Sequence, residues 1–202
     1  MSLFRKLFSS KSEKNKEDIK STERGKYMPK EELPIDESFT INFKKNGGKF
    51  LYCDSLDEVY DNLNNIILEN NWEDNKVFFY DKNLEDKFKS SQLNVGSSLS
   101  QCTYFITTCE NLIANDGSLL VSSNQLAEKK LNEFPNNVIV YATTSQIVPN
   151  ISEGLRVIKS KNPNKIPTNI TTIKHFKLQE EKDFLSYGSS SKNLYLLLLE
   201  DL

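Results

Sequence analysis

Short blocks of apolar residues alternate with polar blocks along most of this chain, and the spacing within each block predicts a helix or a strand. From Leu56 to Ile67 the apolar residues recur at intervals of three, four and seven, which is typical of an amphipathic helix. Ser55 and Glu58 stand at the spacing of a capping box, so we expect this helix to begin there.

The other blocks complete a series of strands and helices. Strands are expected at residues 49–53, 77–80, 103–107, 118–121, 138–142, 170–174 and 194–199. Helices are expected at residues 84–88, 124–132 and 151–161, and in a segment capped by Asp36 that carries Phe39, Ile41 and Phe43. Because uninterrupted apolar strands alternate with helices, the predicted fold is α/β, with a largely parallel sheet between layers of helices. Periodicity alone does not distinguish a flavodoxin-like from a Rossmann-type arrangement.

The first 35 residues are expected to form a basic tail, and residues 36–202 a single domain. Residues 1–30 contain nine Lys/Arg and four Asp/Glu, and residues 11–30 have no hydrophobic periodicity, which is typical of a disordered linker. Residues 1–8 present apolar side chains on one side of a short helical pattern, interrupted by Arg5 and Lys6. This segment is interpreted either as a frayed terminus or as a weak membrane-surface or partner contact.

Charge, hydropathy and cysteine content exclude several classes of protein. Residues beyond 30 contain 17 basic and 24 acidic residues, so nucleic acid is not the expected partner. No secretory signal or transmembrane segment is seen, since the longest apolar run, 194–199, is far shorter than the ~20 residues that span a bilayer. Cys53, Cys102 and Cys109 lack the spacing of zinc or iron–sulfur ligands, which favours free thiols in the cytoplasm and predicts no bound metal or cofactor.

Residues 109–121 are the most informative stretch of the chain. They follow the strand expected at 103–107 and contain an apolar half-turn, residues 112–114. Asn115, Asp116 and Gly117 then predict a tight turn, and a second strand begins at Ser118. Such a loop often directs backbone N–H groups and hydroxyls toward a small anion.

Three loops are candidate ligand sites, because open α/β sheets bind ligands at the carboxyl ends of their strands. The residues proposed to bind a ligand are Asn115, Asp116, Gly117, Ser118, Ser122, Ser123, Gly188, Ser189 and Lys192. The alternative for each loop is an ordinary polar turn. Glu110 and Asp116 are weak catalytic candidates, each a carboxylate able to act as a base or nucleophile. His175 is the only histidine, which leaves no histidine-based metal site, and no nucleotide-binding motif is present.

The same stretch resembles the signature of the LUD family, the lactate utilisation protein C proteins. Residues that match this signature are Cys109, Ile113, Ala114, Gly117, Leu119 and Val121, with Glu110 and Ser118 as close replacements. Residues 134–140, 146–149, 153–155, 188 and 194–199 agree with further family segments in order and spacing. The resemblance implies a three-layer α/β sandwich of the sugar-phosphate isomerase and CoA-transferase (NagB/RpiA-like) type.

By this resemblance the chain is expected to be an accessory or binding protein of lactate oxidation, acting with iron–sulfur partner subunits. Two departures affect the family's site: Asn115 and Asp116 differ from its carboxylate–threonine pair, and residues 171–176 lack its glycine, proline and arginine. A degenerate member that serves as a protein-interaction module is therefore an alternative. A small-molecule isomerase or CoA-transferase-like enzyme is a further alternative.

Overall fold

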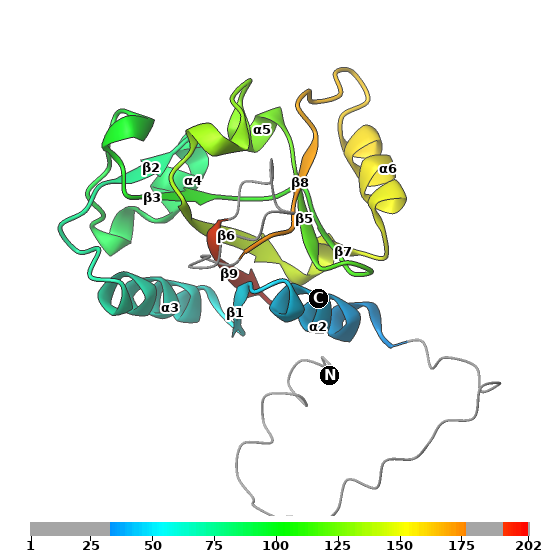
Figure 1. Cartoon of the computed structure of the whole chain (residues 1–202), viewed down its shortest axis with the longest axis horizontal. Coiled ribbons are helices and arrows are strands. Elements are labelled where there is room, and N and C mark those ends of the chain that lie inside the picture. The colour runs from blue at the N-terminus through cyan, green and yellow to red at the C-terminus, as the bar shows by residue number, and fades with distance from the viewer. Residues whose placement is uncertain (1–32, 177–191, 202) are drawn as a thin grey trace, which may run out of the picture.

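The computed structural model describes residues 33–176 and 192–201. The predicted tail lies almost entirely outside these residues, as do Gly188 and Ser189. The described helices are α2 (Ile35–Lys45), α3 (Leu56–Glu69), α4 (Lys82–Lys87), α5 (Ser123–Leu126) and α6 (Ile151–Lys161). The strands are β1 (Lys49–Cys53), β2 (Val77–Phe79), β3 (Tyr104–Thr107), β4 (Asn111–Ile113), β5 (Ser118–Val121), β6 (Asn137–Thr143), β7 (Ile147–Val148), β8 (Thr171–Ile173) and β9 (Asn193–Leu199) (Figure 1).

The main sheet has five strands in the order β1-β9-β6-β3-β2, all of them parallel. Strand β9 lies between β1 and β6, with Leu196 opposite Phe50 on one side and Val140 on the other. Its run of leucines follows from this position, because a strand covered on both faces needs apolar side chains at odd and even positions alike. Leu196 packs into one core and Leu197 into the other. The predicted α/β fold with a parallel sheet between layers is confirmed.

Helix α3 covers one face of the main sheet. Its buried face is formed by Val59, Leu63, Ile66 and Ile67. Leu56, which the periodicity placed on this face, is instead 41% exposed because it stands in the first turn, at the rim of the core. Ser55 caps the helix by accepting a 3.3 Å hydrogen bond from the Glu58 amide, as the spacing predicted. The Glu58 carboxylate accepts from the amide of Asp54, one residue earlier than in a standard capping box.

The other face of the main sheet packs against α2 and a second, four-stranded sheet in the order β7-β4-β5-β8. The sequence analysis did not predict a second sheet. It also predicted an apolar half-turn at residues 112–114, which is wrong because residues 111–113 form β4. Leu112 faces the core shared with the main sheet, whereas Ile113 packs against Ile158 of α6. The second sheet therefore lies between the main sheet and α6 (Figure 1).

Two helix predictions also need correction. The helix expected at 124–132 ends at Leu126, because Ala127 has a φ of 52° and Asn169 bonds the carbonyls of Ala127 and Lys129. In α2 the N-cap is Pro34 rather than Asp36, which lies in the first turn. Ile41 is 53% exposed, so the buried face of α2 is formed by Phe39 and Phe43 without it.

Candidate functional site

The predicted turn at residues 115–118 joins β4 to β5 in the second sheet. Its polar side chains bond to one another: one carboxylate oxygen of Asp116 accepts from the amide of Ser118 at 3.0 Å and from its hydroxyl at 2.6 Å. The other oxygen lies 3.5 Å from the ammonium of Lys174. These bonds are local, and they fix the shape of the turn.

Helix α2 packs directly on this turn. Asn46 donates a 2.7 Å hydrogen bond to the carbonyl of Asp116, and Asn42 donates a 2.8 Å bond to that of Ala114. Gly117 has a φ of 67°, and a Cβ built on it would stand 2.3 Å from the carbonyl carbon of Asn42. Glycine is required here by both conformation and space. The most family-like residues of the chain therefore form a contact between α2 and the second sheet.

Glu110 and Ser122, twelve positions apart in sequence, flank the β4–β5 hairpin and are brought together. The Ser122 hydroxyl donates a 2.6 Å hydrogen bond to the Glu110 carboxylate, which also accepts from the Asn124 amide group at 2.9 Å. Ser122 is fully buried and caps α5 by accepting from the backbone amide of Asn124. Ser123 accepts from the amide of Thr168. The predicted Ser122–Ser123 pair thus holds the start of α5 in place.

Lys192 is fully buried immediately before β9, at the amino end of the main sheet. Its ammonium donates to the backbone carbonyls of Phe134 and Pro135, at 2.8 and 3.2 Å. Burial lowers the pKa of Lys192 to about 8. The position is unexpected, since the sequence argument placed this loop at a carboxyl end.

The predicted residues do not form one site. Ser118 and Ser122 stand at opposite ends of the extended strand β5, a separation of roughly 13 Å at 3.3 Å per residue. Lys192 and Asp116 both contact the segment of residues 174–175: the amide of Lys192 donates to the carbonyl of His175, and Asp116 pairs with Lys174. Gly188 and Ser189 lie outside the described residues.

A polar cluster that the sequence analysis missed lies at the carboxyl ends of β6 and β9. Asp201 accepts hydrogen bonds from the Ser145 hydroxyl at 2.7 Å, from its amide at 2.9 Å and from the Thr144 hydroxyl at 3.0 Å. Burial alone would raise the pKa of Asp201, but these hydrogen bonds lower it. The neighbouring Glu200 accepts from the hydroxyl of Tyr52. This cluster joins residues 200–201 to β1 and to the segment that follows β6.

The structure describes three free cysteines, of which Cys53 and Cys109 are buried and Cys102 is half-buried. Burial raises the pKa of the Cys53 and Cys109 thiols. Within residues 33–176 and 192–201, no three His, Cys, Asp or Glu side chains are grouped so that they could hold a metal ion. Of the helices in these ranges, none has the length and apolarity needed to cross a bilayer.

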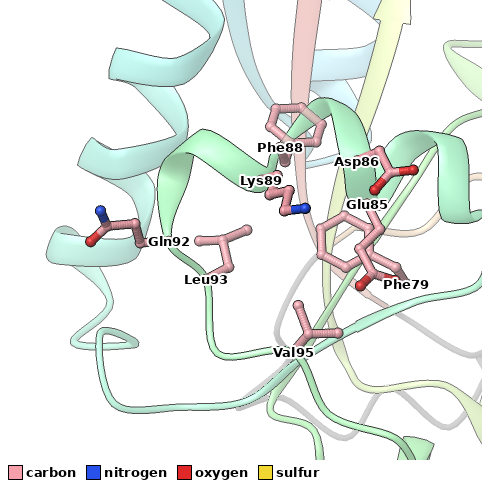
Figure 2. Close-up of a pocket in the computed structure, with 8 residues that line it drawn as sticks. All are labelled: Phe79, Glu85, Asp86, Phe88, Lys89, Gln92, Leu93 and Val95. Atoms are coloured by element: carbon pink, nitrogen blue, oxygen red, sulfur yellow. The ribbon is translucent and has the colours of Figure 1, made fainter.

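Two cavities flank the segment of residues 88–95, which covers the outer edge of β2. The smaller cavity, of about 160 Å³, is drawn in Figure 2. It is lined by Phe79, Glu85, Asp86, Phe88, Lys89, Gln92, Leu93 and Val95. The larger cavity, of about 320 Å³, is lined by Asn64, Ile67, Leu68, Glu73, Ser91, Gln92, Leu93, Asn94 and Tyr104. Neither cavity is lined by a residue that the sequence analysis proposed to bind a ligand or to act in catalysis, because no local motif marks these positions.

These features define a mixed α/β protein with one parallel and one mixed sheet. A solved structure of a DUF162 family protein from Deinococcus radiodurans has the same fold: the TM-score is 0.59 at 13% identity, covering 83% of this chain and 96% of that one. No curated protein matches the sequence. The family model of the LUD domain matches residues 37–198, and the chain belongs to this family.

Proposed function

We propose that this protein is a non-catalytic accessory of the LUD family, which supports lactate oxidation to pyruvate by binding iron–sulfur partner subunits. The observation that carries the non-catalytic part is the state of the Glu110 carboxylate. It accepts hydrogen bonds from the hydroxyl of Ser122, which is the N-cap of α5, and from the side-chain amide of Asn124 in the first turn. A carboxylate that already accepts these two hydrogen bonds is poorly placed to act as a base or nucleophile.

The second carboxylate supports the same conclusion. Asp116 is bonded to the amide and hydroxyl of Ser118 and pairs with Lys174, within a turn that packs on α2. Both candidate carboxylates therefore have structural partners, and they stand near opposite ends of β5. This arrangement favours an accessory role over the isomerase or CoA-transferase alternative.

The lactate link rests on the resemblance to lactate utilisation protein C, and the need for partners follows from the chemistry. Oxidation of lactate requires an electron acceptor, and this chain's cysteines lack the spacing of iron–sulfur ligands. In this proposal the partner subunits carry the redox groups.

Growth of a deletion strain of the native cell tests both parts of the proposal. Loss of this protein is expected to slow growth on lactate but not on glucose, and tagged protein is expected to recover iron–sulfur subunits. Complementation with a Glu110→Gln, Asp116→Asn variant should restore growth, because the amides preserve most of the hydrogen bonds.

Complementation and purification each test a different part of the proposal. If the folded double variant does not restore growth, the carboxylates are catalytic and the non-catalytic part fails. If repeated purifications recover no iron–sulfur subunit, or growth on lactate is unaffected by the deletion, the lactate link fails. Melting temperatures of the variant and the wild type show whether both are folded.

A further inference from the structure

Tyr104 lines the larger cavity. The residue is only 1% exposed, and it lines the cavity beside Leu93. Its ring is held by Trp72, which stacks on it at 4.9 Å with an angle of 14° between the planes. Among the residues that the structure describes, none bonds to the Tyr104 hydroxyl. Burial raises the pKa of Tyr104 to about 12, so the hydroxyl stays protonated and can donate at neutral pH.

Ser91 lines the same cavity and has a hydroxyl that is itself buried. No residue that the structure describes bonds to its Oγ. A buried polar group left unpaired costs about 1–3 kcal/mol, so such groups are rare in stable proteins. Ser91 and Tyr104 line one cavity, and a bound molecule there would supply hydrogen-bond partners to both hydroxyls.

The size and the walls of the cavity define what this molecule is. About 320 Å³ is within the range of ligand pockets and roughly twice the ~150 Å³ of a cavity that holds benzene. Ile67, Leu68 and Leu93 provide apolar wall. Figure 2 shows that the Gln92 side chain, which both cavities share, points away from Phe79 and the smaller cavity.

Charge selects between ligand classes. Glu73 is the one charged residue that lines this cavity, and no Lys or Arg does so. A carboxylate or phosphate would lose its hydration without gaining a cation, which is unfavourable. An uncharged ligand with a carbonyl to accept from Tyr104, and an N–H to donate to Glu73 or to an amide oxygen of Asn64 or Asn94, meets no such penalty.

We propose that the larger cavity binds a small uncharged molecule of the carboxamide or lactam class, with its carbonyl on the Tyr104 hydroxyl and its apolar part against Ile67 and Leu93. This site is separate from the Glu110–Ser122 pair and does not depend on the partner proposed above. It gives the protein a ligand-binding activity of its own.

Benzamide and benzoate are matched probes, because they have the same shape and differ in charge. In an NMR titration of the whole chain, benzamide is expected to shift the methyl signals of Ile67, Leu68 and Leu93, and to bind at least about tenfold more tightly than benzoate. Tyr104→Phe should weaken benzamide binding about threefold to tenfold, and Ser91→Ala should also weaken it, since each removes one hydrogen bond.

Tyr60→Phe is the control, because the Tyr60 hydroxyl donates to the carbonyl of Lys87 and lies outside the cavity. It should leave benzamide binding unchanged but lower the melting temperature. Tyr104→Phe should leave the melting temperature of the protein without ligand close to that of the wild type, because no residue that the structure describes bonds to the hydroxyl. The proposal is overturned if benzoate binds as well as benzamide, if the shifts map elsewhere, or if Tyr104→Phe destabilises the protein and leaves binding unchanged.

Discussion

The Ser122 hydroxyl and the Glu110 carboxylate form a 2.6 Å hydrogen bond that joins the entry of β4 to the start of α5. Strand β5 leads directly into Ser122, and the amide of Glu110 donates to the carbonyl of Leu120 on the same strand. These two hydrogen bonds extend the pairing of β4 with β5 past the ends of both strands.

A double-mutant cycle measures what this pair contributes. Ser122→Ala is expected to lower the free energy of unfolding by about 1–2 kcal/mol, because it removes a helix cap and leaves Glu110 without one partner. Glu110→Gln should cost less, and the coupling energy of the two changes should be about 1 kcal/mol in chemical denaturation. Ser100→Ala, at an exposed serine, is the control. Additive effects of the two changes would show that the bond contributes nothing.

Gly117→Ala should destabilise the contact between α2 and the second sheet. The new Cβ would meet the backbone of Asn42 at 2.3 Å, and φ at this position is 67°. The expected loss is at least about 2 kcal/mol by thermal or chemical unfolding. Gly154→Ala in α6 is the matched control: its Cβ would approach the end of the flexible Leu120 side chain at 3.0 Å, and we expect a change within about 1 kcal/mol. Equal losses of stability in the two variants would contradict the steric role assigned to Gly117.

Lys192 makes a contribution to stability that rises with pH. Its pKa of about 8 in the folded state lies below its ordinary value of 10.5, so the unfolded state binds more protons between these values. The free energy of unfolding of the wild type, measured relative to that of a Lys192→Met variant, should therefore increase by about 1–2 kcal/mol between pH 8 and 9.5. The comparison is needed because the raised pKa values of the Cys53 and Cys109 thiols lower the stability of both proteins in this interval. A difference between the two proteins that stays flat or falls would show that burial does not lower the pKa of Lys192.

Cysteine reactivity should follow burial. Cys102 is half-buried, whereas Cys53 and Cys109 are buried. In the native protein iodoacetamide is expected to modify Cys102 first, and the other two only after denaturant is added. Mass spectrometry of digested samples locates the label. Early modification of Cys109 would mean that the β3–β4 connection opens readily, contrary to its place in the main core.

The sequence by itself determined those helices and strands whose hydrophobic periodicity follows from a buried face of the element. Helix α6 begins and ends where the spacing predicted, and β5 matches as well, because the periodicity of a buried face is local information. The parallel main sheet follows from long apolar strands that alternate with helices. The family resemblance at residues 109–121 also predicted the fold class, which the structure and the family model confirm.

Only the tertiary structure decided where these residues act. Three residues, 111–113, gave no strand signal alone, and they form β4 because β5 and β7 pair with them on both sides. Asp116 and Lys192 read as ligand groups in sequence, yet Asp116 bonds to Ser118 and pairs with Lys174, and Lys192 donates to two distant carbonyls. Tyr104 read as an ordinary strand residue, yet it lines the larger cavity, and no residue that the structure describes bonds to its hydroxyl. Whether a polar group is satisfied depends on what the whole fold brings beside it, and no local pattern encodes that.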